Sequence, residues 1–138
     1  MGRVLAFDYG TKRVGVAVTD PLKIIASTLE TQPTLKIYDF IKAYCLQNEV
    51  EAFVVGFPYN HGHGENDVVP HIETFIAKLQ ELYPNKPITK IDERYTSAIA
   101  QRTLIASGVS KKDRRNKGSI DAISANLILQ SYLEINSR

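Results

Sequence analysis

Three consecutive strand-like segments at the start of the chain constrain its fold more than any other feature. Arg3 to Tyr9, Arg13 to Thr19 and about Ile24 to Glu30 are short and apolar, with β-branched residues, and turn residues separate them. Segments of this kind, with no helical period between them, predict strands. The chain is therefore expected to begin as a meander of three antiparallel strands.

Helix and strand patterns alternate in the rest of the chain. Parallel strands need crossover helices, so this order predicts an α/β fold. We expect a five-stranded mixed sheet, with three antiparallel strands and then two parallel ones, flanked by helices, and this arrangement resembles the ribonuclease H-like fold. The later segments are a helix over Leu35 to Cys45, a strand over Ala52 to Phe57, a helix over Val69 to Leu82, a strand in KPITKIDE, and helices over Ser97 to Ser107 and Ile120 to Leu133.

Length and composition limit the class of protein. A chain of 138 residues fits one domain, spanning residues 1–138. Its 43% hydrophobic and 23% charged content is typical of a soluble globular protein. The start of the chain lacks a signal-peptide pattern, and no apolar run approaches the roughly 20 residues that span a bilayer. We therefore expect a cytoplasmic protein with no membrane insertion, and its single Cys45 can form no internal disulfide.

Three acidic residues at the ends of predicted elements form the candidate site. Asp8 ends the first strand, Glu93 follows the strand ITKID, and Asp121 lies in the first turn of the last predicted helix. If the strands share one sheet, their carboxyl ends meet at one edge and the three carboxylates converge there. Converging carboxylates repel one another unless a hard cation such as Mg²⁺ or Mn²⁺ binds them. Because such ions support in-line displacement at phosphorus, this set predicts hydrolysis of phosphodiesters.

Each acid also has a structural interpretation. Asp121 could stabilise a helix N-terminus, where an acid contributes about 0.3–1 kcal/mol. Glu93 could be a solvated acid paired with Arg94, which is worth about 0–1 kcal/mol. Asp8 is harder to explain in this way, because an ionised side chain at the end of an apolar strand costs several kcal/mol unless something pairs it. Taken singly, Asp8 favours a functional role, whereas Glu93 and Asp121 favour the structural one.

Basic residues gather beside these acids. One cluster occupies the loop directly before Asp121, and the turn after Asp8 adds two more cations. The net charge of +2 indicates nothing by itself, and an isolated basic loop can simply be solvated. Cations next to a metal and phosphate site would instead contact a nucleic-acid backbone. The candidate nucleic-acid contacts are Lys12, Arg13, Asn60, Arg94, Lys111, Lys112, Arg114, Arg115 and Lys117.

The segment NHGHGEN contains two histidines at a spacing that can bind a transition metal. No cysteine accompanies His61 and His63, and Glu65 is the acid beside them in the sequence. A zinc site is therefore disfavoured. The segment is more typical of a loop that follows the strand ending near Gly56 and approaches a substrate, with Asn60 as a polar contact.

Four motifs in order resemble one family, the bacterial YqgF/RuvX proteins. They are DYGTKRVGVA from Asp8, VVGFPYN from Val54, DERYTS from Asp92 and KGSIDAISANLILQ from Lys117. Family members commonly carry a glycine where this chain has His63. The resemblance covers nearly the whole chain and implies a ribonuclease H-like fold with Asp8, Glu93 and Asp121 as an acidic metal-binding triad.

The resemblance implies a Mg²⁺- or Mn²⁺-dependent endonuclease that matures the 5′ end of pre-16S rRNA in ribosome biogenesis. Branched DNA, as for a Holliday junction resolvase, is the alternative substrate, and it would call for a homodimer with two sites. A second class is nucleotide binding, because the Asp8 hairpin is similar to the first phosphate loop of the actin and sugar-kinase superfamily. The second domain of that superfamily is missing. A third class is a non-catalytic RNA-binding factor acting on ribosomal particles, against which the intact acid set argues.

Overall fold

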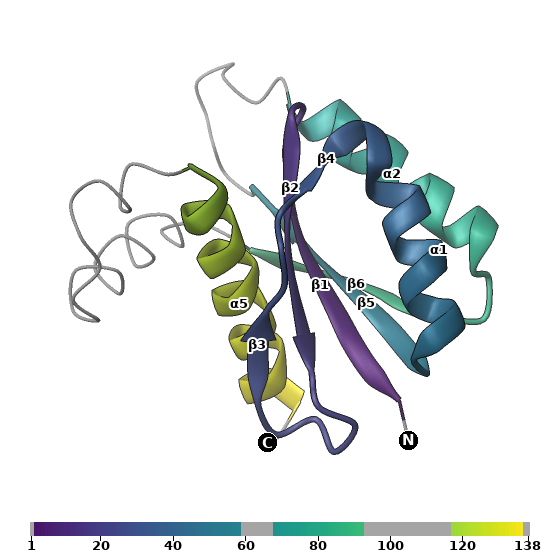
Figure 1. The fold of residues 1–138 in the computed structure, drawn as a ribbon, viewed down its shortest axis with the longest axis vertical. Coiled ribbons are helices and arrows are strands. Elements are labelled where there is room, and N and C mark those ends of the chain that lie inside the picture. The colour runs from purple at the N-terminus through teal and green to yellow at the C-terminus, as the bar shows by residue number, and fades with distance from the viewer. Residues whose placement is uncertain (1, 59–67, 93–116, 137–138) are drawn as a thin grey trace.

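A mixed sheet with helices on both faces forms the protein (Figure 1). The computed structural model describes residues 2–58, 68–92 and 117–136. The strands are β1 (Arg3–Tyr9), β2 (Arg13–Thr19), β3 (Ala26–Thr28), β4 (Gln32–Pro33), β5 (Val50–Phe57) and β6 (Ile88–Asp92). The helices are a 3₁₀ turn η1 (Thr34–Lys36) and the α-helices α1 (Ile37–Gln47), α2 (Val68–Leu82) and α5 (Lys117–Asn136).

The sheet combines an antiparallel half and a parallel half. Its strand order is β3-β2-β1-β5-β6, with β4 pairing to β2 beside β3. Strands β1, β2 and β3 are antiparallel neighbours, whereas β5 is parallel to β1 and β6 is parallel to β5. The carboxyl ends of β1, β5 and β6 therefore lie at one edge, where open α/β sheets bind ligands.

The two faces of the sheet carry different helices. Helices α1 and α2 cover one face and α5 covers the other, as Figure 1 shows. Successive side chains of β1 point to opposite faces of the sheet. Leu5 and Phe7 therefore pack with α1 and α2, whereas Val4 and Ala6 pack with α5. This strand is buried on both faces and consequently reads as an unbroken apolar run.

Aromatic rings fill the layer between the sheet and α2. Phe75 meets Phe7 edge to face with ring centroids 5.4 Å apart, and Phe53 lies 6.0 Å from Phe7. All three side chains are fully buried. Burial on this scale, at roughly 25 cal/mol per Å² of apolar surface, stabilises the closing of α2 over the sheet.

The described elements confirm the mixed sheet and its flanking helices, with two corrections. The sheet has a sixth strand besides the five expected, because the two-residue β4 is too short to show a period in the sequence. Helix α5 begins at Lys117 rather than near Ile120, so Asp121 is its fifth residue and lies beyond the first turn. That position weakens the macrodipole interpretation of Asp121. The predicted helix over residues 97–107 lies outside the described residues.

Within the described residues, no helix is both long enough and apolar enough to cross a membrane.

Candidate active site

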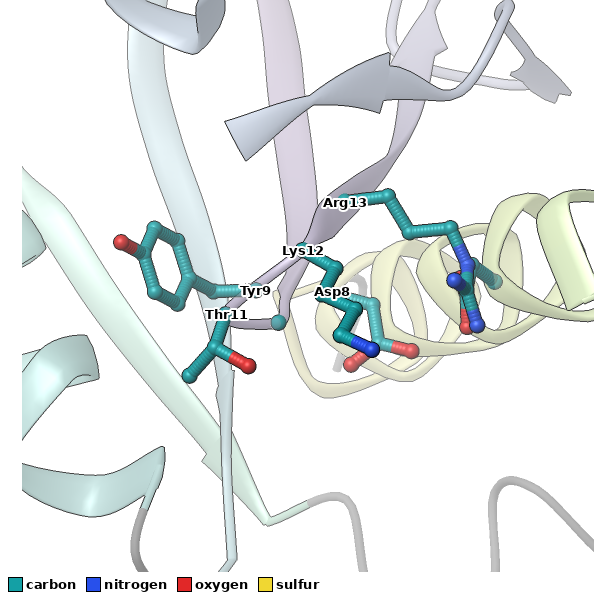
Figure 2. Close-up of a pocket in the computed structure, with 7 residues that line it drawn as sticks. Asp8, Tyr9, Thr11, Lys12 and Arg13 are labelled. Carbon is teal, nitrogen blue, oxygen red and sulfur yellow. The ribbon is translucent and has the colours of Figure 1, made fainter. Parts of the chain in front are cut away.

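A pocket of about 390 Å³ opens where β1 turns into β2, at the carboxyl edge of the parallel strands (Figure 2). It contains two of the three predicted acids together with both cations of the turn. Its lining residues are Asp8, Tyr9, Gly10, Thr11, Lys12, Arg13 and Asp121. The pocket therefore joins the first hairpin to a helix that lies more than 100 residues later in the sequence.

Strand alternation places Asp8 on the side of the sheet that α5 covers. Val4 and Ala6 pack with α5, and Asp8 follows them at the same two-residue spacing. The carboxylate is half-buried, and Asp8 stands opposite Gly15 in the β1–β2 register. A rigid central strand thus holds one acid at the pocket, while the neighbouring strand presents no side chain beside it.

Asp121 reaches the same pocket because α5 lies directly on Gly15. A Cβ atom placed on Gly15 would lie 2.0 Å from the Asp121 carbonyl oxygen and 2.4 Å from its carbonyl carbon. Real Cβ contacts are essentially never under 3.0 Å. Glycine is therefore the residue that permits this approach of helix to strand.

Arg13 binds Asp121 directly. Its Nε donates to Oδ2 of Asp121 over 2.6 Å, a charge-assisted bond between side chains that are 36% and 25% exposed. Arg13 lies two residues before Gly15 on β2, so both face α5. The structure therefore gives Arg13, a predicted nucleic-acid contact, a partner within the chain.

The turn between Tyr9 and Arg13 is tied to the start of the first helix. Thr34 Oγ1 donates to the Gly10 carbonyl oxygen over 2.6 Å, and the Thr34 amide donates to the Lys12 carbonyl oxygen over 3.1 Å. Lys12 itself is exposed and lines the pocket. These bonds hold the turn so that Lys12 stays at the mouth of the pocket.

Tyr9 points away from the acids in Figure 2, on the opposite side of β1 from Asp8. Its ring stacks on Phe75 with centroids 4.8 Å apart. Burial raises the pKa of the Tyr9 phenol above its ordinary value, so Tyr9 is neutral at pH 7. Tyr9 anchors the end of β1 in the aromatic layer and thereby fixes the strand that carries Asp8.

The chemistry of the lining suits a hard divalent cation. Asp8 and Asp121 supply carboxylate oxygens, which Mg²⁺ and Mn²⁺ prefer. The Asp121 carboxylate already attracts a positive group, the Arg13 guanidinium. Among the described residues, no three acids, histidines or cysteines come together as a metal-binding group. The third predicted ligand, Glu93, is not among those residues.

Of the remaining predicted nucleic-acid contacts, one lies within the described residues and six do not. Lys117 begins α5, the helix that carries Asp121. The others lie in the two internal segments outside the described residues, and they are Asn60, Arg94, Lys111, Lys112, Arg114 and Arg115.

Two residues of the site were missed by the sequence interpretation. Gly15 lies inside a strand pattern, where an isolated glycine is itself a signal of close backbone approach. Thr34 gives no local signal, because its partner Gly10 is 24 residues away. A strand glycine opposite a candidate acid could have been found, whereas the Thr34 bond depends on how β4 and η1 fold back.

Comparison with known proteins identifies relatives over the whole chain. A family model described as RuvX, Holliday junction resolvase, matches residues 2–135. A relative from Porphyromonas gingivalis is 48% identical over 134 residues, covering 97% of each chain. One from Amoebophilus asiaticus is 46% identical over 138 residues, covering 100% of this chain and 98% of its own. Both relatives are provisionally named pre-16S rRNA nuclease.

A solved structure shares the fold at low sequence identity. RuvC from Thermus thermophilus, in complex with a Holliday junction substrate, superposes with a TM-score of 0.62 at 15% identity and covers 99% of this chain and 96% of its own. This likeness shows the ribonuclease H-like fold. The family match and the relatives over the whole chain define the class of the protein as a nuclease, an enzyme that hydrolyses ester bonds of nucleic acid. Within that class, the chain belongs to the RuvX family.

Proposed function

We propose that the chain is a divalent-metal-dependent endonuclease that trims the 5′ end of pre-16S rRNA in the cytoplasm. The observation that carries this proposal is the shared pocket of Asp8 and Asp121, at the edge of a ribonuclease H-like sheet. The relatives' provisional name supports the RNA substrate. In this function, residues 1–138 act as one nuclease domain on ribosomal precursor particles.

The acidic and the basic residues have different roles in the proposed reaction. Asp8 and Asp121 would hold Mg²⁺ or Mn²⁺, with Glu93 as the third proposed ligand. When bound there, such a cation would activate the attacking water and neutralise charge that develops on the phosphate. Lys12 in the turn, and the basic residues before α5, position the nucleic-acid backbone.

Branched DNA is a second candidate substrate. The family's description as Holliday junction resolvase favours it, and so does the RuvC fold. Resolving a four-way junction requires two symmetric cuts and hence two copies of this chain, whereas trimming an RNA end requires one. Sedimentation of the protein with each substrate would therefore accompany the cleavage assay.

A side-by-side assay tests the proposed substrate. Precursor 16S rRNA and a four-way DNA junction are offered at equal loading with Mg²⁺ or Mn²⁺, and products are mapped on gels. We expect cleavage of the RNA at the 5′ end of the mature sequence. Cleavage confined to the junction would replace the RNA assignment with the DNA one. Cleavage of neither substrate would favour a non-catalytic RNA-binding factor.

Lys12 offers a separate test of nucleic-acid binding. We expect Lys12→Gln to weaken RNA binding about fivefold near 100 mM salt, because one phosphate contact is lost. The slope of log affinity against log salt should fall by about one. Fluorescence anisotropy with labelled RNA, in EDTA, measures both values.

The matched control for Lys12→Gln is Lys42→Gln. Lys42 is an exposed lysine on α1, which covers the opposite face of the sheet from α5. We expect this control to bind RNA like the unmodified protein. Equal affinities and slopes for the two variants would rule out Lys12 as a phosphate contact.

A further inference from the structure

Arg13 and Asp121 form an ion pair inside the pocket that is proposed to bind a cation. Asp121 is one of the two carboxylates that line the pocket and are proposed to hold a divalent cation. The Nε–Oδ2 distance of 2.6 Å is that of a strong charge-assisted bond. A guanidinium and a divalent cation would then compete for the same carboxylate.

The two partners differ in how freely they can move. Asp121 belongs to a helix whose backbone lies against Gly15, so its main chain cannot shift without separating α5 from β2. Arg13 starts β2 and its side chain is 36% exposed. A long, partly exposed side chain can change rotamer without unpacking the core. The Arg13 side chain can therefore withdraw while the helix that carries Asp121 stays in place.

Electrostatics favour such an exchange. With no cation bound, Arg13 offsets the repulsion between the two carboxylates of the pocket. A divalent cation at the same carboxylates would repel the guanidinium, since like charges a few ångströms apart disfavour each other. Arg13 also lines the pocket with Lys12, so a released guanidinium would lie where a phosphate is proposed to bind. Its planar fork suits phosphate oxygens.

We propose that Arg13 is an exchange residue: it holds Asp121 until a divalent cation binds, and is then released to contact a substrate phosphate. This inference rests on the proposed metal-dependent nuclease function. Arg13 then couples two binding events. Cation binding favours nucleic-acid binding, and by linkage nucleic-acid binding favours cation binding to the same degree.

Binding of Mn²⁺, followed by the electron paramagnetic resonance signal of the free ion, tests the exchange without measuring activity. We expect Arg13→Gln to bind Mn²⁺ about fivefold more tightly than the unmodified protein, since a partly exposed competing ion pair is removed. Lys12→Gln removes the same charge from the same pocket without touching Asp121. We expect its affinity to rise less than about twofold.

Arg13→Lys is a second, more conservative variant, which keeps the test valid if Arg13→Gln misfolds. Arg13→Lys keeps the charge but loses the planar guanidinium, and should give a Mn²⁺ affinity between those of Arg13→Gln and the unmodified protein. Weaker or unchanged Mn²⁺ binding in both Arg13 variants would overturn the exchange, as would equal gains for Arg13→Gln and Lys12→Gln.

Asp8→Asn separates failure of this inference from failure of the proposed function. Mn²⁺ binding that disappears in Asp8→Asn supports the metal site whatever the Arg13 variants do. If the unmodified protein and Asp8→Asn bind Mn²⁺ equally, the proposed metal site is wrong and the exchange falls with it. If only the Arg13 variants behave unexpectedly, the metal site stands and the exchange alone is wrong.

Discussion

Asp8→Asn should reduce the cleavage rate by about 10³-fold or more while the variant still binds nucleic acid. The substitution exchanges a charged carboxylate for a neutral amide of nearly the same shape, so the pocket loses an anionic ligand at little cost in packing. Loss of a metal ligand removes several kcal/mol of transition-state stabilisation, and each 1.36 kcal/mol is tenfold in rate. Single-turnover cleavage with saturating enzyme measures the rate.

The control for Asp8→Asn makes the same chemical change elsewhere in the chain. Asp39 is exposed in the first turn of α1, on the face of the sheet opposite α5. We expect Asp39→Asn to cleave at the unmodified rate. Anisotropy in EDTA should give nearly equal RNA affinities for both variants. Full cleavage by Asp8→Asn with metal present would contradict the active-site assignment.

Gly15→Ala should cost the protein both stability and its metal site. The added Cβ would lie 2.0 Å from the Asp121 carbonyl oxygen, and that atom is backbone, which cannot rotate away. Helix α5 must therefore move off β2. Overpacking of this kind costs about 3 kcal/mol. Because Asp121 moves with the helix, Mn²⁺ affinity should fall about tenfold or more, as when a ligand loses its support.

A stability-matched variant separates the two effects of Gly15→Ala. Leu129 is fully buried between α5 and the sheet, two turns beyond Asp121. Leu129→Ala should cost about 2–5 kcal/mol through the cavity it leaves. It should nonetheless keep Mn²⁺ affinity at temperatures where it is folded. Urea unfolding gives the free energies. Unchanged stability and unchanged Mn²⁺ binding in Gly15→Ala would contradict the close approach of α5 to β2.

Much of the fold was predictable because its elements carry local periods. The strands β1 and β2 were predicted with the bounds that the structure gives, since each is a compact apolar run between turn residues. Helix α2 begins one residue earlier than predicted, at Val68, and ends at Leu82 as predicted. The bounds of β3 were less accurate, because only Ala26–Thr28 of the predicted segment pairs with β2. A short edge strand has few ladder bonds to define its ends.

The candidate site was predictable in part. Asp8 was identified because an ionised side chain at the end of an apolar strand needs an explanation. Asp121 was already a candidate from its sequence position and from the family resemblance, and the structure places it in the same pocket as Asp8. Its role as a metal ligand stays a prediction. The placement of Glu93 stays a prediction.

The sequence by itself determined the chain order of the longer strands and helices that the structure describes, and the acid at the end of β1, because these follow from residue type and spacing within a dozen positions. Only the tertiary structure decided that Arg13 pairs with Asp121, 108 residues away, and that the backbone of α5 lies against Gly15. The physical reason is that such contacts depend on which strands are neighbours and how closely α5 lies on them. The local spacing of residues in the sequence does not indicate how closely α5 approaches the sheet.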